Sequence, residues 1–335
     1  PAGKYQTTDI TTDPTSNKCD DCLGGQYAAE SGATTCSNCG GGTYSSGGAS
    51  VCTSCTNGRF ATAGSTSCAL CVAGKYSAYG SVAFCTDCAS GRYSADSGAT
   101  ACAACQAGQF ASNIGTISCS DCDNGKYSGS SGASLCDECK NGMYSDSTGA
   151  VACTTCLEGK YSTEPFGGAT YCFTCGTGQY SSSGAPICSS CLPGTYASST
   201  GSAACTDCDA GRYAESNGNS ACSGCAWGKF QASSGASSCT SCVPGQYQAD
   251  TGSTACVPCS AGTFESGTGQ TSACVSCAEG QYTSSPGASL CSDCAAGKYA
   301  SGANTITCTS CSADGTFSGA GAGSCTGCLP GTFSA

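Results

Sequence analysis

The spacing of the cysteines constrains this chain more than any other feature. All 38 cysteines fall into 19 C-x-x-C pairs, which run from Cys19/Cys22 to Cys325/Cys328. The step from one pair to the next varies between 16 and 19, and a total span of 306 in 18 steps gives a mean period of 17. A short fixed period predicts a repeat array, in which each unit needs its neighbours to complete its packing.

Other residues keep the same period. A Gly stands three residues after the second cysteine of a pair, and a Tyr or Phe stands two residues further on, in 18 of 19 cases. One inserted residue after Cys311 moves the pattern to Gly315 and Phe317. A second Gly precedes the next pair by four residues in 15 of 19 cases, and Asn304 fills that slot once. Because Asn tolerates left-handed backbone better than most residues, the slot predicts a turn with positive φ.

The expected fold class is small, disulfide-rich and mostly β. No segment has helical periodicity, and glycine recurs too often for long helices. Short strands are expected around each aromatic residue and around each C-x-x-C, with Gly/Ser turns between them. Residues 1–18 read as a partial first repeat with a Thr-rich extended loop, 19–328 as the array, and 329–335 as the start of a truncated repeat. Together they predict an elongated, solenoid-like rod of hairpins, one for each step of the period.

Ordinary core residues are scarce, so cysteine must supply much of the stability. Met and Trp occur once each, whereas cysteine exceeds one residue in nine, a proportion typical of disulfide scaffolds. The periodic aromatic residues are interpreted as a core spine, with a ligand-stacking ladder as the alternative. The first members of this aromatic spine are Tyr27, Tyr44, Phe60, Tyr76, Tyr93 and Phe110.

Three disulfide schemes fit the spacing. Bonds inside each C-x-x-C would be of the redox-active kind and would connect nothing distant. Crossed bonds between adjacent motifs would make alternate intervals different, yet no alternation is visible and 19 is odd. The uniform scheme joins the second cysteine of each pair to the first of the next. It predicts the bonds Cys22–Cys36, Cys39–Cys52 and Cys55–Cys68, and so on along the array.

The uniform scheme leaves two cysteines over, Cys19 and Cys328. Pro1 to Tyr5 resembles the stretch that follows a second cysteine, and the chain stops seven residues after Cys328. We therefore expect both cysteines to be unpaired within this segment or bonded beyond it. The partner would lie in a longer chain or in the next subunit.

The unit C-x-x-C-x-x-G-x-Y-S-x-x-x-G-A-x-x-C-x-x-C resembles the ephrin-receptor-like cysteine-rich repeat and the smallest module of TNF-receptor-type domains. Cys191 through Cys205 is a good example. The resemblance implies the same pairing, for instance Cys191–Cys205. It also implies an extracellular or cell-surface protein, since long arrays occur in giant surface and fibre proteins of protists and algae. The extra cysteines of full receptor domains are absent, so receptor function is not implied.

Composition excludes several functions. Without histidine there is no Ser-His-Asp triad and no His-ligated metal site, and we expect no enzyme, cofactor or metal. Eleven basic against 22 acidic residues argue against nucleic-acid binding. No apolar run in this segment is long enough to span a membrane. No N-x-[S/T] sequon occurs, but 55 Ser and 38 Thr are compatible with O-glycans.

Three functions remain open. The first is an extracellular structural protein, secreted as a rigid rod, stalk or filament subunit that self-associates into a fibre or continues in a longer chain. The second is a ligand-binding or adhesive ectodomain, which needs a patch that breaks the repeat. The candidate patch residues are Tyr79, Phe84, Phe166, Tyr171, Phe173 and Trp227. The third is multi-site zinc binding, because the motif spacing is close to that of zinc ribbons.

Overall fold

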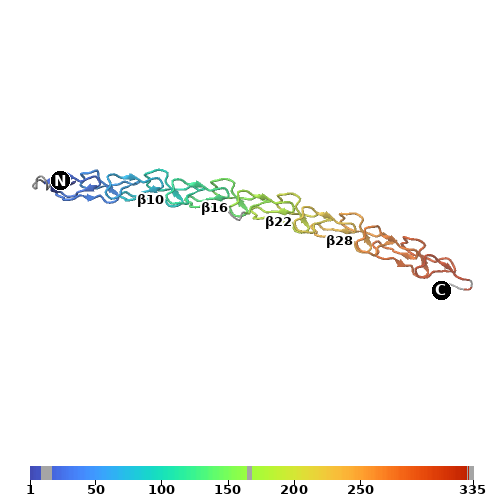
Figure 1. Ribbon diagram of the computed structural model, residues 1–335. Coiled ribbons are helices and arrows are strands. Elements are labelled where there is room, and N and C mark those ends of the chain that lie inside the picture. Colours follow the sequence, from blue (N-terminus) through green and yellow to red (C-terminus); the bar gives the residue numbers. More distant parts are fainter. Residues whose placement is uncertain (9–16, 164–167, 330, 332–335) are drawn as a thin grey trace. The chain divides into compact units, whose positions relative to one another are not determined.

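The computed structural model describes residues 1–8, 17–163, 168–329 and 331 (Figure 1). In these residues the chain forms no helix. It forms 38 short strands, which pair as 19 antiparallel two-stranded hairpins in chain order. Two compact bodies contain them: Pro1–Cys156 with Ser162–Cys172, and Leu157–Tyr161 with Phe173–Ala335. The predicted class, small disulfide-rich β hairpins that recur with the period of the C-x-x-C pairs, is confirmed.

The first strand of each hairpin ends on the periodic aromatic residue, except in the longer β1. These strands are β1 Lys4–Thr8, β3 Gln26–Tyr27, β5 Thr43–Tyr44, β7 Arg59–Phe60, β9 Lys75–Tyr76, β11 Arg92–Tyr93, β13 Gln109–Phe110, β15 Lys126–Tyr127, β17 Met143–Tyr144, β19 Lys160–Tyr161, β21 Gln179–Tyr180, β23 Thr195–Tyr196, β25 Arg212–Tyr213, β27 Lys229–Phe230, β29 Gln246–Tyr247, β31 Thr263–Phe264, β33 Gln281–Tyr282, β35 Lys298–Tyr299 and β37 Thr316–Phe317.

The second strand consists of the two middle residues of the next C-x-x-C, again except for the longer β2. These strands are β2 Asn17–Asp21, β4 Ser37–Asn38, β6 Thr53–Ser54, β8 Ala69–Leu70, β10 Thr86–Asp87, β12 Ala103–Ala104, β14 Ser120–Asp121, β16 Asp137–Glu138, β18 Thr154–Thr155, β20 Phe173–Thr174, β22 Ser189–Ser190, β24 Thr206–Asp207, β26 Ser223–Gly224, β28 Thr240–Ser241, β30 Val257–Pro258, β32 Val275–Ser276, β34 Ser292–Asp293, β36 Thr309–Ser310 and β38 Thr326–Gly327.

A tight turn leads into each first strand. In the repeat of β7, the amide of Arg59 donates to the carbonyl of Thr56 at 3.2 Å, and Gly58 between them has φ +77°. Positive φ at the third residue is the mark of a type II turn, which favours Gly there and Pro before it. Pro193-Gly194 has this sequence at the same place. The first periodic glycine is therefore fixed by turn geometry.

One disulfide closes each hairpin after the first, β1–β2, which contains the free Cys19. In the repeat of β7 and β8, Cys55 bonds Cys68, and the amide of Cys71 donates to the carbonyl of Gly58 at 2.9 Å. Thirty-six cysteines form 18 such bridges, each across 13 to 16 residues, in the pairing that the uniform scheme predicts. A bridge across a loop of this length stabilises by about 3 kcal/mol, mainly by restricting the unfolded chain.

The buried core consists of small residues and sulfur rather than of rings. The second cysteine of nearly every pair is buried, as at Cys39 and Cys71, and so is the small residue that follows the aromatic, as at Ala61 and Ser77. The expected aromatic spine is half-buried instead. Its rings at Tyr27, Tyr44, Phe60, Tyr76, Tyr93 and Phe110 all keep intermediate exposure. The rings are thus largely covered but not fully buried, and disulfides and close backbone contacts make up the centre.

Each repeat contacts the next repeat and also the one after it. The amide of Gly58 donates to Ser77 of the next repeat at 3.0 Å, and the amide of Ala61 donates to Val82 at 3.2 Å. Two repeats on, the backbone of Gly98 lies so close to Gly58 that a Cβ on Gly58 would overlap it. The same contact recurs from Gly3 to Gly108 in the first body and from Gly159 to Gly280 in the second.

Candidate functional site

Two surface grooves lie between consecutive hairpins in the described part of the chain. We name the first the Arg59 groove, and its volume is about 300 Å³. It is lined by Tyr44, Ser54, Cys55, Thr56, Arg59, Ser67 and Cys68. Tyr44 belongs to one repeat, and Thr56, Arg59 and Ser67 belong to the next. Thr56 follows the second cysteine of its pair, Arg59 starts the strand β7, and Ser67 precedes the first cysteine of the following pair.

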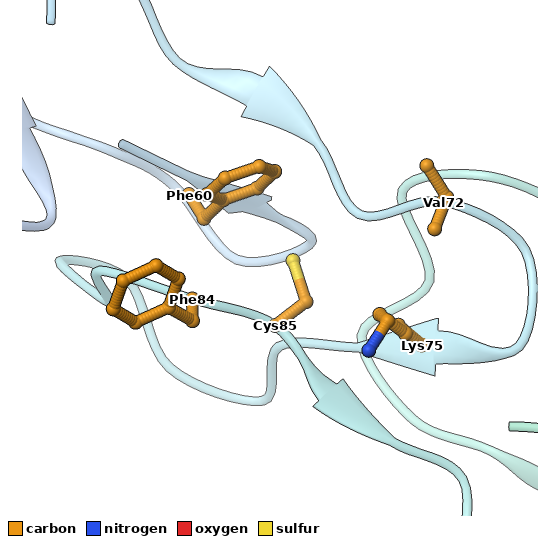
Figure 2. Close-up of a pocket in the computed structure, with 5 residues that line it drawn as sticks. All are labelled: Phe60, Val72, Lys75, Phe84 and Cys85. Carbon is orange, nitrogen blue, oxygen red and sulfur yellow. The ribbon is translucent and has the colours of Figure 1, made fainter. Parts of the chain in front are cut away.

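The second, the Phe84 groove, lies one repeat further along. Its volume is about 200 Å³, and it is lined by Phe60, Val72, Lys75, Phe84 and Cys85. Figure 2 shows the rings of Phe60 and Phe84 at one end and Val72 and Lys75 at the other, with Cys85 between them. The Phe84 side chain is 72% exposed. This groove is therefore an open apolar hollow with one cation at its edge.

The two grooves use equivalent positions with different chemistry. Thr56 and Ser67 in the first groove correspond to Val72 and Phe84 in the second, while the ring and the cation are kept. All four of these variable residues are exposed, so the scaffold does not depend on them. The hairpin can therefore present polar or apolar side chains at these two positions without a change in its core.

Nine of the first strands begin with Lys or Arg, and six of these cations bind one of two kinds of partner. Where the facing residue on the second strand is acidic, an ion pair forms across the strands, at 2.7 Å between Lys75 and Asp87 and at 3.6 Å between Lys126 and Glu138. The same arrangement pairs Lys4 with Asp21, and this hydrogen bond together with the carboxylate charge raises the pKa of Lys4.

Where the facing residue carries no charge, an arginine binds backbone instead. Arg59 faces Leu70, and its Nη1 donates to the carbonyl of Cys68 at 3.1 Å. Two further arginines repeat this geometry on the later cysteine of the bridge that closes their own loop, Arg92 on Cys102 at 3.1 Å and Arg212 on Cys222 at 3.3 Å. Sequence reasoning missed this division, although the residue before the second cysteine carries the signal.

The predicted patch residues do not form one site. Phe84 lines its groove, whereas Tyr79, which is 79% exposed, does not line it. Phe173 packs against Tyr161 across β19 and β20, with ring centroids 5.5 Å apart, while Tyr171 and Trp227 are exposed. Phe166 lies outside the described residues.

The cysteines leave little capacity for metal binding or thiol chemistry. Zinc binds deprotonated cysteine, and a sulfur in a disulfide is not available as a thiolate. Within the described part of the chain, Cys19 and Cys328 are the free cysteines, and no group of three or more His, Cys, Asp or Glu residues could hold a metal ion. The disulfides thus remove the donors that a multi-site zinc protein would need.

Comparison with known proteins agrees with the repeat structure. The family model described as tyrosine-protein kinase ephrin type A/B receptor-like matches residues 178–219, 211–255 and 245–294. No curated protein matches the chain. Among the residues that the structure describes, no helix has the length and apolarity to cross a membrane. Tandem disulfide-rich repeats of this kind are typical of extracellular domains. Residues 178–294 are thus ephrin-receptor-like cysteine-rich repeats, set within a longer array of disulfide-closed hairpins.

Proposed function

We propose that the chain is a non-catalytic structural element outside the cell, a rigid segment of a rod, stalk or filament. Support comes from the uniformity of the hairpins. Each repeat after the first hairpin has one disulfide, one type of turn and one set of main-chain contacts to its neighbours. Exposed positions such as Thr56 and Val72 vary in polarity, which suits a protein whose task is to hold a length and present a surface.

The main observation that supports this proposal is the contact between each repeat and the repeat two positions later. Two domains joined by a linker move as separate bodies unless their interface is large. Here the linker is only the C-x-x-C, and its residues are themselves a strand of the hairpin. Gly58 is held by Ser77 of the next repeat and lies against Gly98 of the one after. Bending between repeats would therefore break main-chain hydrogen bonds within a body.

Small-angle scattering of the oxidised chain tests this proposal. A rigid array predicts an elongated particle whose largest dimension is the same from 0.05 to 0.5 M salt, because the contacts are main-chain bonds and disulfides rather than ion pairs. The reduced and alkylated chain is the control and should have the profile of an unfolded polymer. A compact particle, or an oxidised chain with the profile of a flexible polymer, would refute the structural role.

Self-association belongs to the same proposal. Oxidised protein should form larger species with rising concentration in sedimentation experiments. Material that stays monomeric up to millimolar concentration, at physiological salt and calcium, would argue that the segment acts within a longer chain and not as a fibre subunit.

A ligand-binding ectodomain is the second candidate, and the Phe84 groove favours it. Phe60, Val72 and Phe84 give this groove a continuous apolar lining, while the preceding groove is polar. If a soluble extracellular partner binds there, Phe84→Ser should weaken its binding, and Phe60→Tyr, which keeps the ring, should not. Equal binding by all three forms would remove this candidate.

A further inference from the structure

The Arg59 groove lies in a part of the chain that has no acidic residues. The sequence has 22 Asp and Glu, yet none occurs in the whole segment from Ser31 to Thr86. The basic residues of this segment are Arg59 and Lys75, and Lys75 is paired with Asp87. In a chain of net charge −11, Arg59 thus stands in the longest stretch without carboxylates.

The guanidinium of Arg59 is held in place but not neutralised. Its Nη1 donates to the carbonyl of Cys68, whose sulfur is fixed by the bridge to Cys55. Across the hairpin it faces Leu70, and it has no carboxylate partner among the described residues. A guanidinium carries five N–H donors, so donors remain for an incoming anion. A planar fork of this kind suits carboxylate and sulfate oxygens.

The rest of the lining suits a sugar ring. Three exposed hydroxyl side chains, Ser54, Thr56 and Ser67, line the same groove as Arg59 and can both donate and accept hydrogen bonds. The half-buried ring of Tyr44 offers an apolar face together with a polar hydroxyl. Pockets that combine an aromatic surface with a few placed polar groups are the usual form of small-ligand sites. A volume of about 300 Å³ is large enough for one hexose ring.

We propose that the Arg59 groove binds an acidic sugar of an extracellular polysaccharide. The carboxylate or sulfate group pairs with Arg59, the ring lies against Tyr44, and the sugar hydroxyls bond with Ser54, Thr56 and Ser67. The hydroxyl-rich lining favours a saccharide over an acidic peptide, whose apolar side chains would find little surface here. This binding is additional to the structural role and does not depend on it.

The array contains its own control for this proposal. Arg212 starts β25 as Arg59 starts β7, and it binds the carbonyl of Cys222 in the same manner. Its surroundings differ in charge, because Asp209 stands at the position of Thr56, with Asp207 and Glu215 close by in the sequence. The same substitution at both arginines therefore changes the same hydrogen bond in two different electrostatic settings.

Fluorescence anisotropy with labelled polygalacturonate tests the proposal at low ionic strength. We expect Arg59→Gln to weaken binding at least about tenfold, Arg59→Lys to weaken it less, and Arg212→Gln to change it by less than about twofold. Unlabelled competitors separate the sources of the anion. Dextran sulfate competing better than polygalacturonate identifies a sulfate ligand, the reverse identifies a uronate, and neutral dextran should not compete.

Three results would overturn the proposal. Equal loss in the Arg59 and Arg212 variants would indicate general charge attraction, and unchanged binding by Arg59→Gln would place the ligand elsewhere. Polyglutamate bound as tightly as polygalacturonate, with the same dependence on Arg59, would assign the groove to acidic peptides. Ser67→Glu is a second variant that leaves Arg59 and its bond to Cys68 in place, and its added carboxylate should also abolish binding. Disulfide mapping by mass spectrometry checks that each variant is folded.

Discussion

The glycines that contact the second repeat along should be the least replaceable residues of this chain. Gly58 and Gly64 belong to the same repeat and have almost the same φ, +77° and +76°. A Cβ at Gly58 would overlap the carbonyl oxygen of Gly98, whereas a Cβ at Gly64 would have no heavy atom within 4 Å. The two sites therefore differ in packing and not in backbone conformation.

The expected costs follow from this difference. An Ala in left-handed backbone costs about 1–2 kcal/mol, which applies to both substitutions. Forcing an extra methyl group into a packed contact adds about 1–3 kcal/mol, which applies to Gly58→Ala alone. Gly58→Ala should therefore lower local stability by about 2–5 kcal/mol and Gly64→Ala by about 1–2 kcal/mol. At about 1.4 kcal/mol per factor of ten, the packing difference is about 5- to 150-fold in an equilibrium constant.

Hydrogen exchange followed by mass spectrometry measures this difference locally. The reporter amides are Cys71, which donates to Gly58, and Gly98, which donates to Cys71 at 2.6 Å. Their protection should fall further in Gly58→Ala than in Gly64→Ala by the factor above. Gly40→Ala is the neutral control, because Gly40 has no positive φ and its Cβ would meet nothing within 4 Å. Equal effects of the Gly58 and Gly64 substitutions would refute the idea that contact between repeats, rather than φ, fixes these glycines.

Three further predictions concern other parts of the hairpin. Ser81 has φ +61° at a position that is usually Gly, so Ser81→Gly should stabilise its repeat by about 0.5–1 kcal/mol. Hydrogen exchange at the amide of residue 81, which donates to the carbonyl of Cys55, measures this change. A decrease in protection would show that the backbone of Ser81 is not strained. Replacing Cys105 and Cys119 together by Ser should lower the local free energy of unfolding by about 3 kcal/mol. Protease cleavage should then be confined to residues 105–119. Cleavage throughout the first body would instead show that the bridges act collectively. Asp87→Asn breaks the exposed ion pair with Lys75 and should lower the free energy of unfolding by no more than about 1 kcal/mol, and by less at high salt. A larger loss of stability in denaturant unfolding would show that this ion pair is structural.

The sequence predicted the periodic parts of the fold because each rests on local chemistry. Positive φ at Asn304, inferred from a single substitution of Gly, is confirmed at +63°. The pairing of Cys22 with Cys36 followed from uniformity along the chain and agrees with the structure.

The features that the sequence did not predict depend on contacts between a repeat and the repeat two positions later. The burial of Ala61 and the partial exposure of Phe60 follow from how closely Gly58 and Gly98 approach, and no pattern within a single repeat encodes that distance. The Arg59 groove was missed for a related reason. Its residues come from two consecutive repeats, and those of the first, such as Tyr44, look like any other member of the period when each repeat is read alone.

Because these contacts extend over three consecutive repeats, they also set the length of the smallest fragment that can adopt the native fold. A single disulfide loop such as Cys55–Cys68 lacks both of the surfaces that Gly58 uses, and a pair of loops still lacks the backbone of Gly98. Only three consecutive loops hold a complete set of contacts for one glycine. Excised peptides should therefore acquire native-like order abruptly at the third loop, and each loop added afterwards should contribute the same increment of free energy.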